Sequence, residues 1–346
     1  EIILDKMPQI DYLIMGESEI ALNKILNSID NSEGFENILG LAYKKNNKFF
    51  KNPKQEILKD LDEIVPYNYD IFDEEVFLRP YNGKLIRAVD YEMSRGCIYS
   101  CSYCVETIIQ KYYSFTESSP ATGSIKNFKS YLRSKSVKNI FYELENLINN
   151  KNIELIRCQD TNFLTNDRRI LTELSDLIFN SQLKFKMYIE TRPEGINQKS
   201  IDLMKKLNID GIGMGIELAD EDFRESSLNR FASQSKTIEA FKILKENGIK
   251  RTAYNIIGLP NQNEESILKT IEFNKELDPD NITVAFYSPY YGTKSQIDGK
   301  DAGIFDDYEF DVDSALRSKT KDSDLLPVNK LKFYKENFVR LVRNEI

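Results

Sequence analysis

The chain has 346 residues, and its 47 Lys and Arg against 55 Asp and Glu give a formal net charge of −8. This charge argues against a broad nucleic-acid-binding surface, and the apolar runs are shorter than the roughly 18 residues that a membrane span needs. The sequence has no histidine, which excludes Ser-His-Asp and Cys-His catalysis, histidine-ligated zinc and a histidine general base.

The start of the chain has the character of the interior of a folded protein. Its first residue is Glu1, and no signal-peptide pattern follows, so we expect further segments upstream. Residues 11–17 predict a strand ending in a turn, residues 18–29 a short helix, and residues 38–50 a hairpin around two consecutive asparagines. These elements are too few for an independent core.

Residues 51–79 form an irregular acidic linker, and residues 80–298 alternate short β-rich runs with helix-period segments. Six strands are predicted, at Leu85–Met93, Ile153–Gln159, Phe185–Glu190, Gly211–Glu217, Thr252–Gly258 and Ile282–Tyr287. Strands alternating with helices predict parallel β/α units. We therefore expect an α/β fold with a partial (β/α)6 TIM-like barrel. A doubly wound sheet has the same alternation and stays open as an alternative.

Residues 299–346 complete the chain. Residues 299–325 are rich in Asp, Lys, Ser and Gly and predict a loop, and a final helix with apolar Leu331 and Phe338 follows. Within the predicted barrel, polar residues follow each strand. Because active sites of β/α barrels lie at the carboxyl ends of the strands, we expect the functional site there.

Three of the four cysteines lie within eight positions, at Cys97, Cys101 and Cys104, directly after the first barrel strand. Thiolates are soft ligands, so three in one loop can hold a metal centre. Structural zinc needs four ligands, and without histidine the fourth would be a carboxylate or Cys158, whose place in a strand favours an inert core thiol. Three cysteines fit better a [4Fe–4S] cluster with one iron open to another ligand.

This cysteine usage does not suit a secreted disulfide framework, so we expect a cytoplasmic protein.

The spacing Cys-x3-Cys-x2-Cys, with Tyr103 before the last cysteine, resembles the radical S-adenosylmethionine (SAM) superfamily over residues 83–295. Further strand-end segments share the resemblance: Asp160-Thr161-Asn162-Phe163, Glu190-Thr191-Arg192, Gly215-Ile216-Glu217, Ile256-Ile257-Gly258-Leu259-Pro260 and Tyr290-Tyr291-Gly292-Thr293.

The resemblance implies that the three cysteines hold a [4Fe–4S] cluster whose open iron is chelated by SAM. It also implies cofactor contacts at the strand ends: Tyr103, Ile257 and Gly258 beside adenine, Glu217 at the ribose or amino group, Arg192 or Arg230 at the carboxylate, and Asp160 and Glu190 as further candidates. A structural ion pair is the alternative for Glu190 and Glu217, and a solvated surface position for Arg230. We interpret the glycines at 211, 213 and 215 as packing features, because no helix opens on the last one.

The implied chemistry is one-electron. The reduced cluster donates an electron to SAM, and the resulting 5′-deoxyadenosyl radical abstracts hydrogen from an unactivated carbon of a small-molecule substrate. Such an enzyme needs a reductant such as flavodoxin or ferredoxin.

Residues 10–19 resemble the last strand and turn of the cobalamin-binding domain that precedes many radical SAM barrels. Residues 1–50 would then be the C-terminal remnant of a Rossmann-like cobalamin-binding domain, with cobalamin as a third cofactor. That branch implies methylation or rearrangement, including a cobalamin-dependent methyltransferase. The alternatives are a radical SAM enzyme without cobalamin and a non-catalytic Fe–S electron-transfer protein. A methylthiotransferase is less favoured, because no second cysteine trio occurs.

Overall fold

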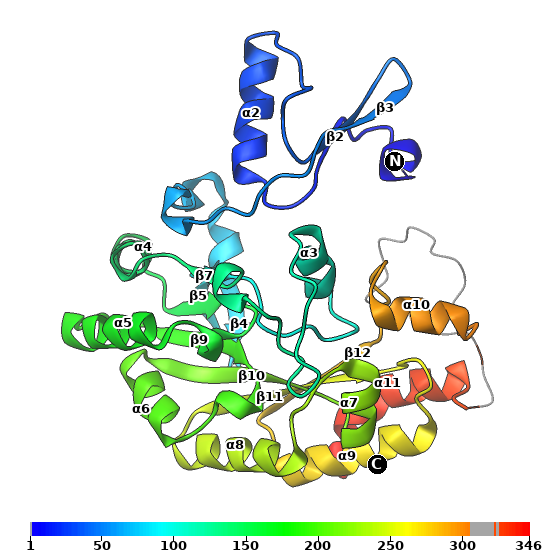
Figure 1. The fold of residues 1–346 in the computed structure, drawn as a ribbon. Coiled ribbons are helices and arrows are strands. Elements are labelled where there is room, and N and C mark those ends of the chain that lie inside the picture. Colours follow the sequence, from blue (N-terminus) through cyan, green and yellow to red (C-terminus); the bar gives the residue numbers. More distant parts are fainter. Residues whose placement is uncertain (1, 305–321, 323–324) are drawn as a thin grey trace.

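A computed structural model describes residues 2–304, 322 and 325–346, with a small N-terminal unit above a larger curved sheet (Figure 1). The strands are β1 (Tyr12–Ile14), β2 (Leu41–Lys45), β3 (Lys48–Lys51), β4 (Leu78–Tyr81), β5 (Lys84–Tyr91), β6 (Ser94–Arg95), β7 (Arg133–Ser134), β8 (Leu155–Cys158), β9 (Lys186–Thr191), β10 (Ile209–Glu217), β11 (Lys250–Ile257) and β12 (Asn281–Phe286). The helices are α1 (Ile2–Lys6), α2 (Glu19–Asp30), α3 (Glu106–Tyr112), α4 (Val137–Lys151), α5 (Arg168–Ser181), α6 (Gln198–Lys206), α7 (Glu221–Leu228), α8 (Gln234–Glu246), α9 (Glu264–Leu277), α10 (Lys294–Asp301) and α11 (Val328–Val342).

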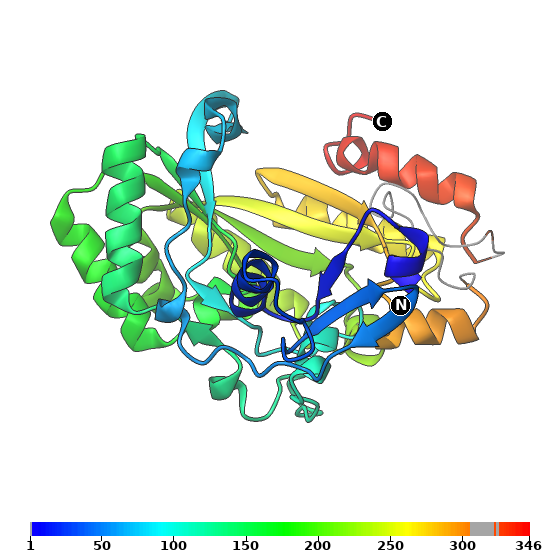
Figure 2. The same cartoon turned by 90° about the horizontal axis from the view of Figure 1, so that it is seen from above.

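The large sheet has the strand order β12-β11-β10-β9-β8-β5-β4 and curls into a half-barrel (Figure 2). All six predicted strands are confirmed, as β5 and β8 to β12, and neighbouring members pair in parallel. Their spatial order follows the chain order, whereas a doubly wound sheet reverses its order at a switch point. The partial barrel is therefore confirmed. The sequence did not predict β4, which pairs antiparallel with β5.

The main core lies between the convex face of the sheet and the helices outside it. On β10, the outward-facing Ile212, Met214 and Ile216 are almost completely buried against this layer. Helices α4, α5, α6 and α8 supply apolar residues to the same core, and Figure 1 shows them around the convex face. Burying each such side chain stabilises the fold by about 1.5–3 kcal/mol, which accounts for the large apolar residue at every second position of β10 from 212 to 216.

The concave face of the half-barrel has glycine on β10 where the convex face has large residues. A Cβ atom at Gly213 would lie 2.5 Å from the ring of Tyr254, and one at Gly211 would lie 2.9 Å from Tyr81 Oη and 3.0 Å from the ring of Tyr188. The hydroxyl groups of Tyr188 and Tyr254 lie 3.0 Å apart. These glycines allow tyrosines of neighbouring strands to lie flat on β10, as the packing interpretation predicted.

The N-terminal unit contains a three-stranded antiparallel sheet, β1-β2-β3, covered by α2. The predicted hairpin is confirmed: Asn46 and Asn47 both have left-handed backbones, with φ of 51° and 59°, as a tight two-residue turn requires. A small separate core joins α2 to β2 through Ala21, Ile25 and Leu41.

The predicted final helix is confirmed as α11, which packs with α9 on the β11–β12 end of the sheet. The loop predicted from residue 299 begins later, because α10 continues to Asp301. Its residues 305–321 and 323–324 lie outside the described residues. Across the described parts of the chain, no helix combines the length and apolar character that crossing a bilayer requires.

A buried ion pair lies beside the first barrel strand. Lys135 Nζ and Glu143 Oε2 are 2.7 Å apart, and their side chains are only 3% and 8% exposed. The ammonium group also lies 5.1 Å from the ring centroids of Tyr67 and Tyr91. Because a buried charge without its partner is costly, this pair should be sensitive to the removal of one member.

We expect Glu143→Gln to lower the free energy of unfolding by about 3 kcal/mol, since it leaves the Lys135 charge buried without a counter-charge. The double variant Lys135→Met/Glu143→Leu should recover most of that loss. Urea unfolding followed by circular dichroism measures both. The control is Asp278→Asn, which breaks the exposed pair with Lys245 and should change stability by less than about 1 kcal/mol. Equal losses for Glu143→Gln and Asp278→Asn would contradict the burial argument.

Candidate active site

The three clustered cysteines lie in the loop between β6 and α3. Cys97 and Cys101 are buried, each 8% exposed, Cys104 is partly exposed, and all three are free thiols. Burial raises the pKa of the Cys97 and Cys104 thiols to about 12. Within the described residues no three cysteine or carboxylate side chains converge on one metal position. As a donor set, three soft sulfur ligands on one short loop fit a [4Fe–4S] cluster with one open iron.

Side chains of α3 hold the backbone of this loop. The carboxylate of Glu106 accepts the N–H of Cys97 at 3.1 Å and the hydroxyl of Tyr131 at 2.5 Å, and burial raises its pKa. Gln110 donates to the carbonyl oxygens of Cys97 and Tyr99 at 3.0 and 2.9 Å. The sequence analysis missed both supports. Their signal was the spacing of two polar residues, i and i+4, on the helix that follows the last cysteine.

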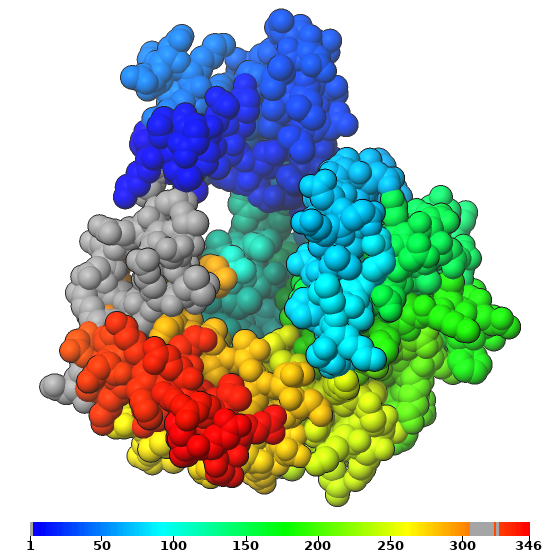
Figure 3. Space-filling model, turned by 180° about the vertical axis from the view of Figure 1, so that it is seen from behind, coloured from blue at the N-terminus to red at the C-terminus, as the bar shows by residue number. Residues whose placement is uncertain are grey.

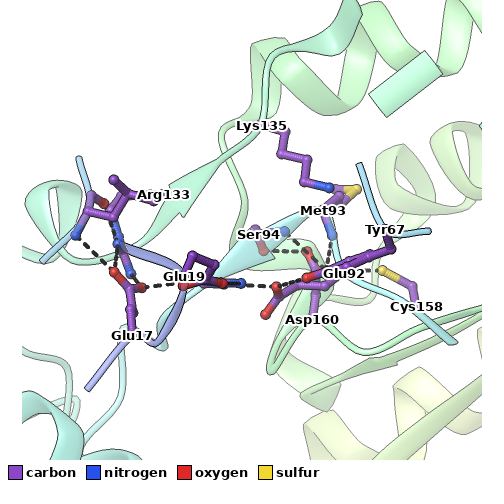
Figure 4. A network of polar contacts seen from close by, with 12 residues as sticks. Glu17, Glu19, Tyr67, Glu92, Met93, Ser94, Arg133, Lys135, Cys158 and Asp160 are labelled. Carbon is purple, nitrogen blue, oxygen red and sulfur yellow. Dashed lines mark hydrogen bonds and ion pairs between the residues drawn. The ribbon is translucent and has the colours of Figure 1, made fainter. Parts of the chain in front are cut away.

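Asp160 lies at the end of β8, where it is 1% exposed. Its carboxylate accepts the N–H groups of Met93 and Ser94 at 2.9 and 3.2 Å, the Ser94 hydroxyl, the Asn166 amide at 2.9 Å and the Cys158 thiol at 3.2 Å (Figure 4). Burial raises the pKa of Asp160, and these donors oppose the rise. The carboxylate therefore faces the protein and fixes the strand end that leads into the cysteine loop. Cys158 is buried, as interpreted.

Tyr103 connects the cysteine loop to the end of β10. Its hydroxyl donates to Glu217 Oε1 at 2.8 Å, and burial followed by the Glu217 charge raises its pKa. Arg230 Nη1 lies 3.8 Å from the same carboxylate oxygen, and Arg230 Nη2 donates to the Gly215 carbonyl. Arg230 is 5% exposed, so the surface alternative is wrong for this residue, whereas the ion pair considered for Glu217 is present.

Glu217 has a left-handed backbone, with φ of +62°, where the pairing of β10 with β11 is irregular. A residue with a Cβ atom rarely adopts this conformation, and such strain concentrates at functional sites. Here the irregularity turns the Glu217 side chain toward Tyr103 and Arg230.

Arg192 follows β9 and lies beside the cysteine loop. Its guanidinium stacks 3.7 Å above the ring centroid of Tyr99, and Nη2 forms an ion pair with Glu194 Oε1 at 2.8 Å. Although Arg192 is 7% exposed, none of its three side-chain nitrogens has a hydrogen-bond partner of good geometry within the described residues. Buried donors of this kind are costly unless a ligand satisfies them, and a carboxylate would accept from two at once.

A cluster of packed apolar side chains lies beside Tyr103. It is formed by Leu218, Leu228, Leu259 and Tyr287, with Ile256 and Tyr103 packed against it. Ile257 instead packs into the core shared by α9 and α11, because successive residues of a strand face opposite sides. The structure thus places Ile256 and Leu259, rather than the Ile257 side chain, in the cluster beside Tyr103. Gly258 follows with φ of +81°, and its N–H donates to Gln262 at 2.6 Å.

Glu190 lies on the concave floor of the barrel. Its Oε1 accepts the hydroxyl of Tyr254 at 3.2 Å, and desolvation raises its pKa. Its hydrogen-bond partner is a phenol and not a cation. Of the two carboxylates weighed as ion-pair members, Glu217 therefore has the arginine partner. The structure gathers Tyr103, Arg230 and Glu217 in one cluster and places Glu190 along the barrel interior.

Comparisons with known proteins identify the family of the chain. The family model of the radical SAM superfamily matches residues 91–273. An uncharacterized methyltransferase from Pyrococcus horikoshii is 26% identical over 85% of this chain and 59% of its own length. The anaerobic magnesium-protoporphyrin IX monomethyl ester cyclase from Rubrivivax gelatinosus is 23% identical, over 83% of this chain and 49% of its own length.

Among solved structures, the fold is similar to the radical SAM methyltransferase TsrM from Kitasatospora setae, determined with cobalamin and a [4Fe–4S] cluster. The TM-score is 0.64 at 15% identity, over 86% of this chain and 55% of that protein. The chain thus spans roughly half the length of the relatives it matches. The family match covers more than half of the chain and includes all three clustered cysteines. The chain belongs to the radical SAM superfamily.

Proposed function

We propose that this protein holds a [4Fe–4S] cluster on Cys97, Cys101 and Cys104 and cleaves SAM reductively to act on an unactivated carbon of a small molecule. The observation that carries the proposal is the meeting of the cysteine loop with two strand ends. Tyr103 of the loop contacts Glu217, and Tyr99 of the loop lies under Arg192. When bound, the cluster supplies the electron that splits SAM into methionine and the 5′-deoxyadenosyl radical.

The residues around the loop suit the separate parts of SAM. Arg192 offers Nε and Nη1, which are buried without a hydrogen-bond partner within the described residues, to the carboxylate. The apolar side chains of Ile256, Leu259 and Tyr103 suit contact with the adenine ring, and the backbone at Gly258 has no Cβ to block its approach. Glu217 suits a hydroxyl or ammonium group of the same ligand. Together these side chains would orient SAM and exclude water from the radical.

We further propose that the reaction is a cobalamin-associated methylation or rearrangement, with the N-terminal unit as the end of a cobalamin-binding domain. A cavity of about 540 Å3 lies between the Gly16–Glu19 turn and the barrel, and Figure 3 shows the surface hollowed between these parts. One face of α2 also exposes Leu22, Leu26 and Ile29 by 48%, 52% and 49%, an apolar stripe that the remainder of such a domain would cover.

The proposal includes a one-electron donor such as flavodoxin or ferredoxin and a cytoplasmic setting, which suits a cluster that must be kept reducible. Its test is anaerobic cluster reconstitution, reduction in the presence of SAM, and chromatography for 5′-deoxyadenosine. Formation of 5′-deoxyadenosine with a SAM-dependent change of the cluster EPR signal supports the proposal. A cluster that assembles but neither responds to SAM nor cleaves it would instead indicate an electron-transfer protein.

Replacement of Cys97, Cys101 or Cys104 by Ala should abolish assembly of the cluster, since two thiolates cannot hold it. Iron and sulfide analysis with EPR measures this. The matched control is Cys158→Ala. This thiol is buried like those of Cys97 and Cys101, but it donates a hydrogen bond to Asp160 and lies outside the cysteine loop. A SAM-responsive cluster in any of the first three variants would refute the ligand assignment.

Arg192→Met should weaken SAM binding about tenfold to a hundredfold, the loss expected when a charge-assisted pair is removed from a buried site. Equilibrium binding of SAM to the reconstituted protein measures this. Arg169→Met is the control, since Arg169 is 91% exposed on the outer helix α5. Equal affinities of Arg192→Met and Arg169→Met would remove Arg192 from the SAM site.

A further inference from the structure

The Gly16–Glu19 turn of the N-terminal unit contacts the segment that follows the cysteine loop (Figure 4). The Glu17 carboxylate forms a two-point ion pair with Arg133, with Oε1–Nη2 of 2.8 Å and Oε2–Nη1 of 3.1 Å. The two side chains are 15% and 8% exposed. Solvent screening, which weakens exposed ion pairs, therefore acts less on this one. The pair joins residues that are 116 positions apart in the chain.

From Arg133 the contacts continue to the first cysteine. Arg133 Nε donates to the Tyr131 carbonyl oxygen at 3.0 Å. The hydroxyl of Tyr131 and the N–H of Cys97 donate to the same oxygen of Glu106. Gly96 also lies directly on Tyr131, because a Cβ at Gly96 would come within 2.6 Å of the Tyr131 carbonyl oxygen. The position of Arg133 is thus linked to the backbone of Cys97.

Helix α3 provides a second link. Tyr113 directly follows the last residue of α3, and its hydroxyl accepts the N–H of Glu17 at 2.9 Å. One turn earlier, Gln110 donates to the Cys97 carbonyl oxygen at 3.0 Å. Successive turns of one helix move together, so the contact at Tyr113 restrains the same cysteine that Glu106 holds.

We propose that the Gly16–Glu19 turn positions the cysteine loop, with Glu17 as the positioning residue. By fixing Arg133 and the end of α3, the turn holds Cys97 where the cluster needs it. The inference rests on the proposed function only in taking Cys97 as a cluster ligand. The same turn and Arg133 line the 540 Å3 cavity, so a ligand in that cavity touches the groups that hold the loop. Its binding and the loop position are therefore coupled.

Because the turn packs closely on α3, Gly16→Ala is a specific test of this contact. Gly16 has φ of +93°, and a Cβ there would lie 2.4 Å from Tyr113 Oη and 2.7 Å from Gln55 Nε2. Alanine at this position requires the Tyr113 hydroxyl and the Gln55 amide to move away, which weakens the contact of the turn with the helix. Gly83 is the matched control, since it also has a positive φ, of +73°, but no atom within 4 Å of an added Cβ. Gly16→Ala and Gly83→Ala both place a Cβ atom on a residue with positive φ, but only the first brings it against neighbouring side chains.

The first test is amide hydrogen exchange on the cluster-free full chain. In Gly16→Ala and Glu17→Gln, amides of residues 97–113 should exchange about tenfold faster, as expected for the loss of a charge-assisted hydrogen bond. Gly83→Ala and Glu272→Gln should match the wild type there. Glu272 is 68% exposed and pairs only locally with Lys275. If residues 12–19 exchange faster while residues 97–113 do not, the turn docks without positioning the loop, and the inference is wrong.

The second test uses the reconstituted protein. In Glu17→Gln, the KM for SAM should rise while kcat is retained, because a loosened loop lowers the fraction of binding-competent molecules. The EPR signal of the reduced cluster with SAM should broaden. Should Glu17→Gln fail to fold, Arg133→Lys keeps the charge, loses the two-point geometry and carries the same expectations. A wild type that forms no 5′-deoxyadenosine refutes the proposed function, whereas the exchange result refutes or supports this inference independently.

Discussion

The candidate site depends on one buried carboxylate. Asp160 accepts hydrogen bonds from Met93 between β5 and β6, from Ser94 at the start of β6 and from Asn166 in the loop after β8. An unpartnered carboxylate in this position would cost several kcal/mol, so its donors must remain in place once the chain has folded. Because Met93 and Ser94 both donate their N–H groups to it, the cysteine loop begins from a fixed point. Asp160 thereby fixes the start of the cysteine loop, which has no regular structure, relative to the parallel sheet.

The sheet could be predicted from the sequence because its physical cause is local and repeated. Strands covered by helices bury apolar side chains on the covered face, and β8 to β12 each contain such residues among β-favouring neighbours. The hairpin at Asn46 and Asn47 was equally visible, because few residues tolerate two successive left-handed positions. The strand β4 was missed, since its residues Leu78–Tyr81 are mostly exposed, include a proline and pair antiparallel at the edge of the sheet.

The polar contacts of the site could be predicted only in part. Cys97, Cys101 and Cys104 are recognisable because metal ligands must keep a fixed spacing in the chain. The stacking of Arg192 on Tyr99 and the support of Cys97 by Glu106 depend on how distant segments meet in space, which no local pattern encodes. The sequence predicted Ile257 beside Tyr103, whereas the structure has Ile256 there, and this difference has a simpler origin. It depends on which face of β11 is turned inward, and a shift of one residue reverses that face.

The tyrosines that pack over the glycines of β10 shape the barrel interior, whereas the residues on the convex face stabilise the sheet. Strand β10 contributes its large residues only to the convex core, while Tyr81, Tyr188 and Tyr254 form the inner surface above it. Replacing one of these rings would deepen the interior by the thickness of an aromatic group without altering strand register. Substitutions at these tyrosine positions can therefore change the size of the space inside the barrel while the sheet itself stays the same. A scaffold of this kind can diversify its chemistry at little cost to folding.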